Sequence, residues 1–142
     1  MSTAIPSRDE TGARFAQSSL LDATDIASRF DELKKIKDGW LDGAGQAPSH
    51  AGLDWLARVL RDRYPDYLPR PYAYPVPDGG VQLEWSIKRQ EISLEIDFES
   101  RRGDWHSLDL NTSQEEQREL RLTDDADWSW VITRLTIAGA TP

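Results

Sequence analysis

The fold is decided by residues 81–98, which read VQLEWSIKRQEISLEIDF. Apolar and polar residues alternate within two runs, 81–87 and 92–98. Successive side chains of a strand point to opposite faces of a sheet, so this alternation predicts two strands with one apolar and one polar face. The runs are close enough to pair as an antiparallel hairpin, with the turn near residues 88–90.

The sequence is compatible with further strands on both sides of this hairpin. Residues 72–74 read Tyr-Ala-Tyr within a connector rich in proline, which is compatible with a short edge strand. Residues 105–110 predict a strand with Leu108 and Leu110 directed inward. Residues 117–122 predict another, for which a helical turn is the alternative.

Three segments have helical spacing of apolar residues. The first spans about 24–37, and the second follows Ser49, a favourable N-cap, and ends at Pro65. The third begins near Thr123, although its β-branched run leaves a strand as the alternative. This order predicts a two-layer α+β domain with two N-terminal helices, a three- to four-stranded antiparallel sheet and a C-terminal helix.

The chain divides into one domain and two short ends. Its 142 residues are enough for one hydrophobic core. Residues 1–21 are polar and predict a flexible N-terminal tail, residues 22–138 form the predicted domain, and residues 139–142 are expected to fray.

The composition restricts the classes of partner. The formal net charge is -8, which disfavours direct binding to nucleic acid and to anionic membranes. Such a surface suits solubility, or a protein partner with a basic patch. There is no cysteine, no secretory leader and no long apolar stretch, so we expect a bacterial-type cytoplasmic protein.

No motif for catalysis or cofactor binding is recognisable. The two histidines, His50 and His106, have no neighbours at the spacing of a metal site, and His106 cannot pair with Ser107 on the opposite strand face. A calcium-loop pattern starting at Asp38 fails because Trp40 and Ser49 occupy ligand positions. We therefore expect no enzyme, no cofactor and no metal.

A binding surface is the favoured interpretation. Strand alternation places Glu84, Glu95 and Asp97 on the polar face of the hairpin, where they could cluster or simply be solvated. The chain has six tryptophans, and exposed tryptophans often anchor interfaces. The predicted partner-binding residues are therefore Glu84, Glu95, Asp97, Trp105 and Trp128.

Two motifs carry a resemblance to a group of small bacterial proteins. They are Gly-Trp-Leu-Asp-Gly-Ala-Gly at residues 39–45 and Val-Pro-Asp-Gly-Gly-Val-Gln-Leu-Glu-Trp at residues 76–85. The chain resembles proteins with a Trp-Asp-Gly loop, a helix and a Pro-Asp-Gly-Gly hairpin, although Leu41 separates Trp40 from Asp42 here. The likeness implies an accessory protein encoded near bacterial mobile and defence genes, and it implies no activity.

These observations favour a non-enzymatic protein-binding module of the antitoxin, immunity, anti-defence inhibitor or complex-subunit type. One alternative is a small hydrolase or nuclease-like enzyme that uses carboxylates and His106. A second is a small-molecule sensor with a pocket between the sheet and the Gly-rich loop.

Overall fold

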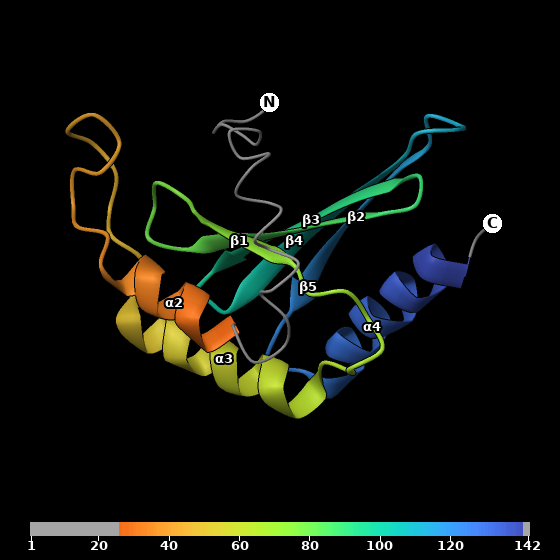
Figure 1. Ribbon diagram of the computed structural model, residues 1–142, viewed down its shortest axis with the longest axis horizontal. Helices are drawn as coiled ribbons and strands as arrows, with labels where there is room; N and C mark the ends of the chain where they lie inside the picture. Colours follow the sequence, from red (N-terminus) through yellow and green to blue (C-terminus); the bar gives the residue numbers. More distant parts are fainter. Residues whose placement is uncertain (1–25, 141–142) are drawn as a thin grey trace.

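The computed structural model describes residues 26–140 (Figure 1). The elements follow in the order α2 (Ile26–Lys34), α3 (His50–Arg63), β1 (Tyr72–Pro75), β2 (Val81–Ile87), β3 (Gln90–Asp97), β4 (Arg102–Asp109), β5 (Glu115–Arg121) and α4 (Asp125–Ala140). The expected tail, the start of the domain at 22–25, and residues 141–142 lie outside the described residues. Gly139 and Ala140, expected in a frayed end, are the last residues of α4.

The sheet has the order β1-β2-β3-β4-β5, and every neighbouring pair is antiparallel. The predicted hairpin is confirmed, with Leu83 opposite Leu94 and Trp85 opposite Ile92. The turn includes Lys88, whose φ of 56° gives the chain its reversal. The α+β class, the two N-terminal helices and the C-terminal helix are also confirmed.

The sheet has five strands, and the expected three or four is too few. The additional strand is β1, in which Ala73 lies opposite Leu83 and is buried. Its edge position explains how it accommodates Pro75, because a proline has no N–H to donate to a second neighbour. The alternative of a helical turn for β5 is wrong, since Leu120 faces the core in register with Gly103.

Strand β4 has the opposite facing to the one predicted. Gly103, Trp105 and Ser107 point into the core, whereas Leu108 lies on the other face and Leu110 follows the strand and is exposed. Trp105 buries far more apolar area than either leucine, so its burial outweighs theirs. The prediction that Leu108 and Leu110 face inward is therefore wrong.

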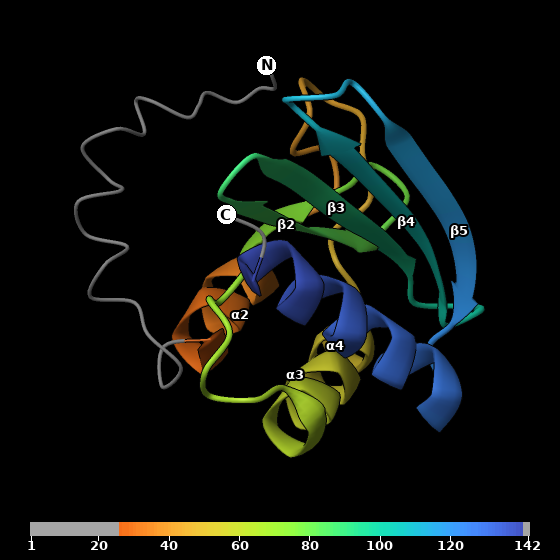
Figure 2. The ribbon, with the colours of Figure 1, turned by 90° about the vertical axis from the view of Figure 1, so that its right-hand side faces the viewer.

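The helices all pack on one face of the sheet, which makes the domain two-layered (Figure 2). The core between the layers joins Leu33 of α2, Leu56 of α3 and Leu135 of α4 to the inward residues of the strands. Helix α3 begins as predicted, because Ser49 Oγ accepts a hydrogen bond from Gly52 N at 3.0 Å. No described helix covers the other face of the sheet.

The two terminal helices differ from expectation in one respect each. Helix α2 ends at Lys34, short of residue 37, because the next N–H groups bond in a tighter turn, with Lys35 N donating to Glu32 O. The strand alternative for α4 is wrong. Its start is held to β5 by Asp127, which accepts from Arg121 N, and by Trp128, which donates to Leu122 O at 2.6 Å.

Candidate functional site

The face of the sheet that no described helix covers is here called the outer face. It carries most of the polar and charged side chains of the strands. It consists of the residues that alternate with the core positions: Tyr72, Tyr74, Gln82, Glu84, Ser86, Glu91, Ser93, Glu95, Asp97, Arg102, Asp104, His106, Leu108, Glu115, Gln117, Glu119 and Arg121. Seven of these are carboxylates and two are arginines. The outer face therefore carries a net negative charge.

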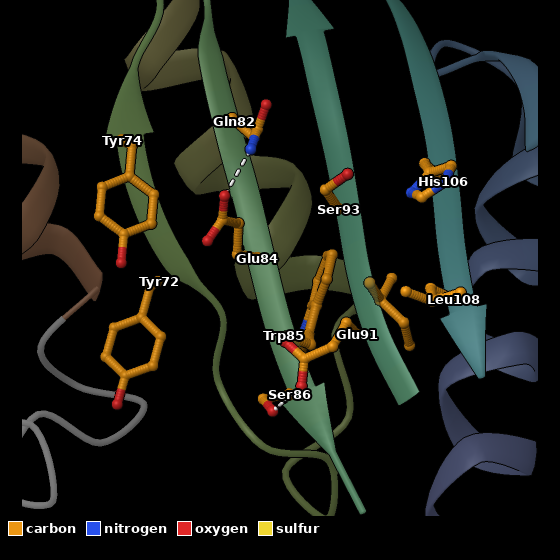
Figure 3. Close-up of a pocket in the computed structure, with 11 residues that line it drawn as sticks. Tyr72, Tyr74, Gln82, Glu84, Trp85, Ser86, Glu91, Ser93, His106 and Leu108 are labelled. Carbon is orange, nitrogen blue, oxygen red and sulfur yellow. Dashed lines mark hydrogen bonds between the residues drawn. The ribbon is translucent and has the colours of Figure 1, made fainter. Parts of the chain in front are cut away.

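A hollow of about 450 Å³ lies on this face and extends from β1 to β4 (Figure 3). Its lining residues are Tyr72, Tyr74, Gln82, Glu84, Trp85, Ser86, Glu91, Ile92, Ser93, His106 and Leu108. Of the five residues predicted to bind a partner, Glu84 is the one in the hollow. The others lie elsewhere on the face or inside the protein.

Glu84 and Glu91 are the two carboxylates of the hollow. Glu84 Oε2 accepts a hydrogen bond from Gln82 Nε2, and Glu91 Oε2 accepts one from Ser86 Oγ, both at 2.5 Å. Both donors are neutral, and neither glutamate forms an ion pair with any residue from 26 to 140. Their negative charges are thus oriented but not neutralised within the described structure.

His106 forms part of the wall on β4. Its Nε2 lies 2.8 Å from Glu115 Oε1 on the neighbouring strand, and Ser93 is its partner on β3. The sequence placed His106 on the same side as Leu108, which is correct, but that side is the outer face and not the core. The hydrogen bond to Glu115 sets the orientation of the imidazole ring.

Glu95 lies beside the hollow, between Gln82 and Asp104. Partial burial, together with the negative charges of Asp78 and Asp104, raises the pKa of its carboxyl group above the ordinary value of 4.5. Desolvation is the largest cause of this rise in pKa, and repulsion from the two neighbouring carboxylates adds to it. Such repulsion lowers the stability of the folded state at neutral pH.

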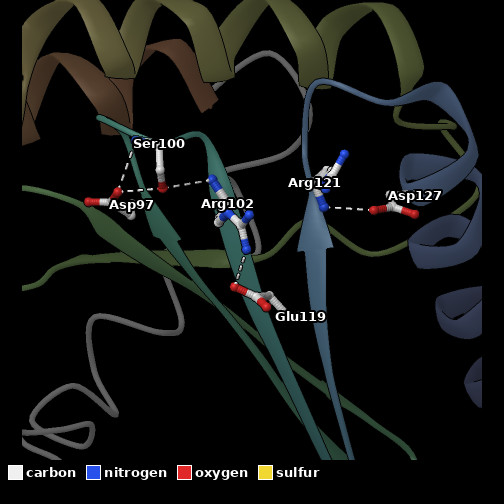
Figure 4. A network of polar contacts seen from close by, with 6 residues as sticks. All are labelled: Asp97, Ser100, Arg102, Glu119, Arg121 and Asp127. Carbon is white, nitrogen blue, oxygen red and sulfur yellow. Dashed lines mark hydrogen bonds and ion pairs between the residues drawn. The ribbon is translucent and has the colours of Figure 1, made fainter.

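Asp97 has a structural role at the end of the sheet (Figure 4). Its carboxylate accepts hydrogen bonds from Ser100 Oγ at 2.5 Å and from Ser100 N at 2.9 Å, and these bonds hold its pKa below 3.8. Nearby, Arg102 pairs with Glu119 at 2.6 Å. The expected cluster is therefore divided: Glu84 lines the hollow, Glu95 lies next to it, and Asp97 closes the β3–β4 turn.

The two tryptophans predicted as contact residues are inside the protein, so their expected exposure is wrong. Trp105 is 2% exposed and packs against Trp85 and Trp130, with ring centroids 6.4 and 5.2 Å away. Trp128 is 3% exposed. Trp130 is half-buried instead, between the guanidinium groups of Arg118 and Arg134 at 4.6 and 5.2 Å from its centroid.

Sequence reasoning missed Tyr72, Tyr74, Glu91 and Leu108 as members of one site. They belong to different strands, and only the register of the sheet brings them together. The alternation within each strand assigns its residues to two faces. It does not say which residues of neighbouring strands lie opposite each other, and for β4 Leu108 and Leu110 led to the wrong face being assigned as inward.

The Gly-rich loop at 38–48 is stabilised by its own hydrogen bonds. Asp38 Oδ1 accepts from Ala47 N, and Trp40 Nε1 donates to Gln46 O, both at 2.8 Å. No residue of this loop lines the hollow on the outer face or the smaller hollow between Ile26, Tyr64 and Arg70.

A metal centre and a hydrolase site also find no support in the geometry. Among residues 26–140, no group of three or more histidines or carboxylates is arranged to hold a metal ion. His106 is paired with Glu115 and not with Glu95 or Asp97, the carboxylates considered for a hydrolase. Nothing in the described residues positively indicates an enzymatic activity.

Comparison of the chain with protein-family models, with curated proteins and with solved structures gives no match. None of the three described helices combines the length and the apolar character that crossing a bilayer requires. The functional argument therefore rests on the outer face and its hollow.

Proposed function

We propose that this protein is a non-enzymatic protein-binding module whose outer face contacts a partner with a basic surface. The observation that carries the proposal is a sheet face with seven carboxylates and two arginines that no described helix covers. An acidic surface attracts and orients a basic partner and accelerates its association.

The size of the face supports this use. Five strands about 4.8 Å apart, with about 3.4 Å per residue along each, give a face about 20 Å wide and about 24 Å long. Side-chain relief adds to this area, which brings it towards the roughly 800 Å² that one partner buries in a standard interface. The outer face thus supplies more than half of the area that one partner buries in a standard interface.

The raised pKa of Glu95 is a second supporting observation. Partial burial of the charged Glu95, together with its position beside Asp78 and Asp104, destabilises the fold at neutral pH, and a polar amide at position 95 would avoid this. Residues that lower stability are frequent where a protein binds its partner or substrate. An antitoxin, immunity, anti-defence inhibitor or complex-subunit role is consistent with such a module and with the motifs at 39–45 and 76–85.

Charge reversal on the outer face tests the proposal. A variant with Glu84→Lys, Glu95→Lys and Asp104→Lys should lose a partner that wild-type protein retains from its host at low ionic strength. A control with Asp31→Lys, Asp62→Lys and Glu99→Lys makes the same change in net charge at exposed positions away from this face.

The proposal requires the control to retain the partner and added salt to release it. If the control loses the partner as completely as the outer-face variant, recognition by this face is contradicted. If wild-type protein remains monomeric and alone at low salt in its host, the function as a binding module is contradicted. Circular dichroism of each variant verifies that it folds.

A further inference from the structure

We propose that the hollow on the outer face is the subsite for one arginine side chain of the partner. The inference rests on the proposed function, because it names the chemical group that the acidic face recognises. It assigns separate roles to the residues of the hollow and to the remaining carboxylates of the face.

The carboxylates of the hollow favour a cation. Glu84 and Glu91 are each oriented by one neutral donor, and neither is neutralised by a described cation. In contrast, Glu119 on the same face is already paired with Arg102, and Glu115 is within hydrogen-bond distance of His106. A guanidinium group can supply charge-assisted hydrogen bonds to Glu84 and Glu91, whereas an anion would be repelled.

The other walls of the hollow fit the stem and the planar head of an arginine. Tyr72 and Tyr74 present their rings on β1, and Glu84 extends from β2 towards them (Figure 3). Leu108 provides apolar surface on the opposite side. An arginine buries its aliphatic stem on apolar surface, and its flat guanidinium group stacks on aromatic rings more readily than a lysine ammonium does.

Contacts between an arginine guanidinium group and an aromatic ring already occur elsewhere in this chain. The guanidinium of Arg70 lies 4.9 Å from the ring centroid of Tyr64, and that of Arg101 lies 4.8 Å from the ring of Trp55. The volume of about 450 Å³ is within the roughly 300–1,000 Å³ of common ligand pockets, so the hollow also has room for the backbone around the arginine.

The test measures binding of a fluorescein-labelled hexa-arginine peptide to the full chain by fluorescence anisotropy, with hexa-lysine as the matched probe. We expect hexa-arginine to bind at least about fivefold more tightly than hexa-lysine at the same ionic strength, because both peptides carry the same charge and differ in the head group. Equal affinity for the two peptides would overturn the assignment to arginine.

Variants then locate the binding site. Glu84→Gln should weaken hexa-arginine binding about tenfold, because a neutral amide replaces a carboxylate partner of the guanidinium. Asp104→Asn is the matched control, since it removes the same charge from the same face outside the hollow, and it should weaken binding less than about threefold. Tyr74→Leu keeps an apolar side chain without an aromatic face and should remove most of the preference for arginine over lysine.

The outcomes separate the subsite from the function as a whole. If Glu84→Gln and Asp104→Asn weaken binding equally, the hollow is not the subsite, while recognition by the acidic face remains. If neither peptide binds to wild-type protein at low salt, the arginine subsite is overturned, and the charge-reversal experiment on the natural partner decides the proposed function independently. Thermal melting of Glu84→Gln shows whether it is folded, and its glutamine oxygen can still accept from Gln82.

Discussion

Single residues on the outer face show a conflict between local stability and charge. Glu95 lies opposite Asp104 on β4 and also interacts with the charge of Asp78, so its carboxylate is repelled by two others. A carboxyl group with a raised pKa holds its proton more tightly in the folded state than in the unfolded state. It therefore causes no loss of stability at low pH, and a loss develops as the pH rises from 4.5 through the raised pKa.

We expect Glu95→Gln to increase the free energy of unfolding at pH 7. The gain should be modest, about 0.5 kcal/mol, because the side chain is largely exposed and solvent screens the repulsion. It should disappear near pH 3, where Glu95 is protonated in both states. Urea unfolding at the two pH values measures this difference, with Glu99→Gln as a control on an exposed turn. A gain that persists at pH 3 would contradict an electrostatic origin.

Two glycines in helices, Gly52 and Gly139, differ in how much space surrounds them. Gly52 lies in the first turn of α3 against Phe98, and a Cβ atom added there would lie 2.2 Å from Phe98 Cγ. Gly139 lies in the last turn of α4, where the nearest atom to an added Cβ is 3.9 Å away. Helix propensity favours alanine at both positions, so only the tertiary contact distinguishes them.

Gly52→Ala should therefore destabilise the protein by about 2 kcal/mol, because α3 has to move away from Phe98 and from the core behind it. Gly139→Ala should stabilise it by about 0.5 kcal/mol through helix propensity alone. Chemical denaturation of the pair gives both values. If the two substitutions change stability in the same direction, the packing of α3 on Phe98 is not as described.

The strands show when the alternation of apolar and polar residues within one strand predicts which of its faces is buried. The alternation in 81–98 correctly identified β2, β3 and their facing, because each run contains several large apolar residues of one parity. In β4 the inward positions are Gly103, Trp105 and Ser107, only one of which is large and apolar. With so weak a pattern, two leucines of the wrong parity reversed the prediction, and Trp105 was assigned to the surface.

In the molecule as a whole, all the described helices pack on one face of the sheet, and the charged side chains of the strands gather on the other face. Seven carboxylates share the outer face with only two arginines, and the net charge of the chain is -8. Self-repulsion among like charges destabilises the compact state, and salt screens it.

Raising the sodium chloride concentration from about 0.02 M to about 0.5 M should therefore increase the stability of wild-type protein by about 1 kcal/mol. A variant with Glu91→Gln, Glu95→Gln and Asp104→Asn should be more stable at low salt and should respond less to added salt. Thermal melting over a salt series tests both expectations. An equal salt response in the two proteins would show that the outer face is not the source of the repulsion.

The sequence by itself determined that two helices precede the central hairpin, the facing of that hairpin, the N-cap of α3 and the acidic character of the polar face. These features depend on local propensity and on the period of apolar residues, which are properties of neighbours along the chain. Only the tertiary structure decided that Trp105 and Trp128 are buried and that Tyr72, Glu84 and Leu108 line one hollow. The physical reason is that such contacts depend on the register between strands and on which large side chain gains most from burial, and both are settled only when distant segments pack together.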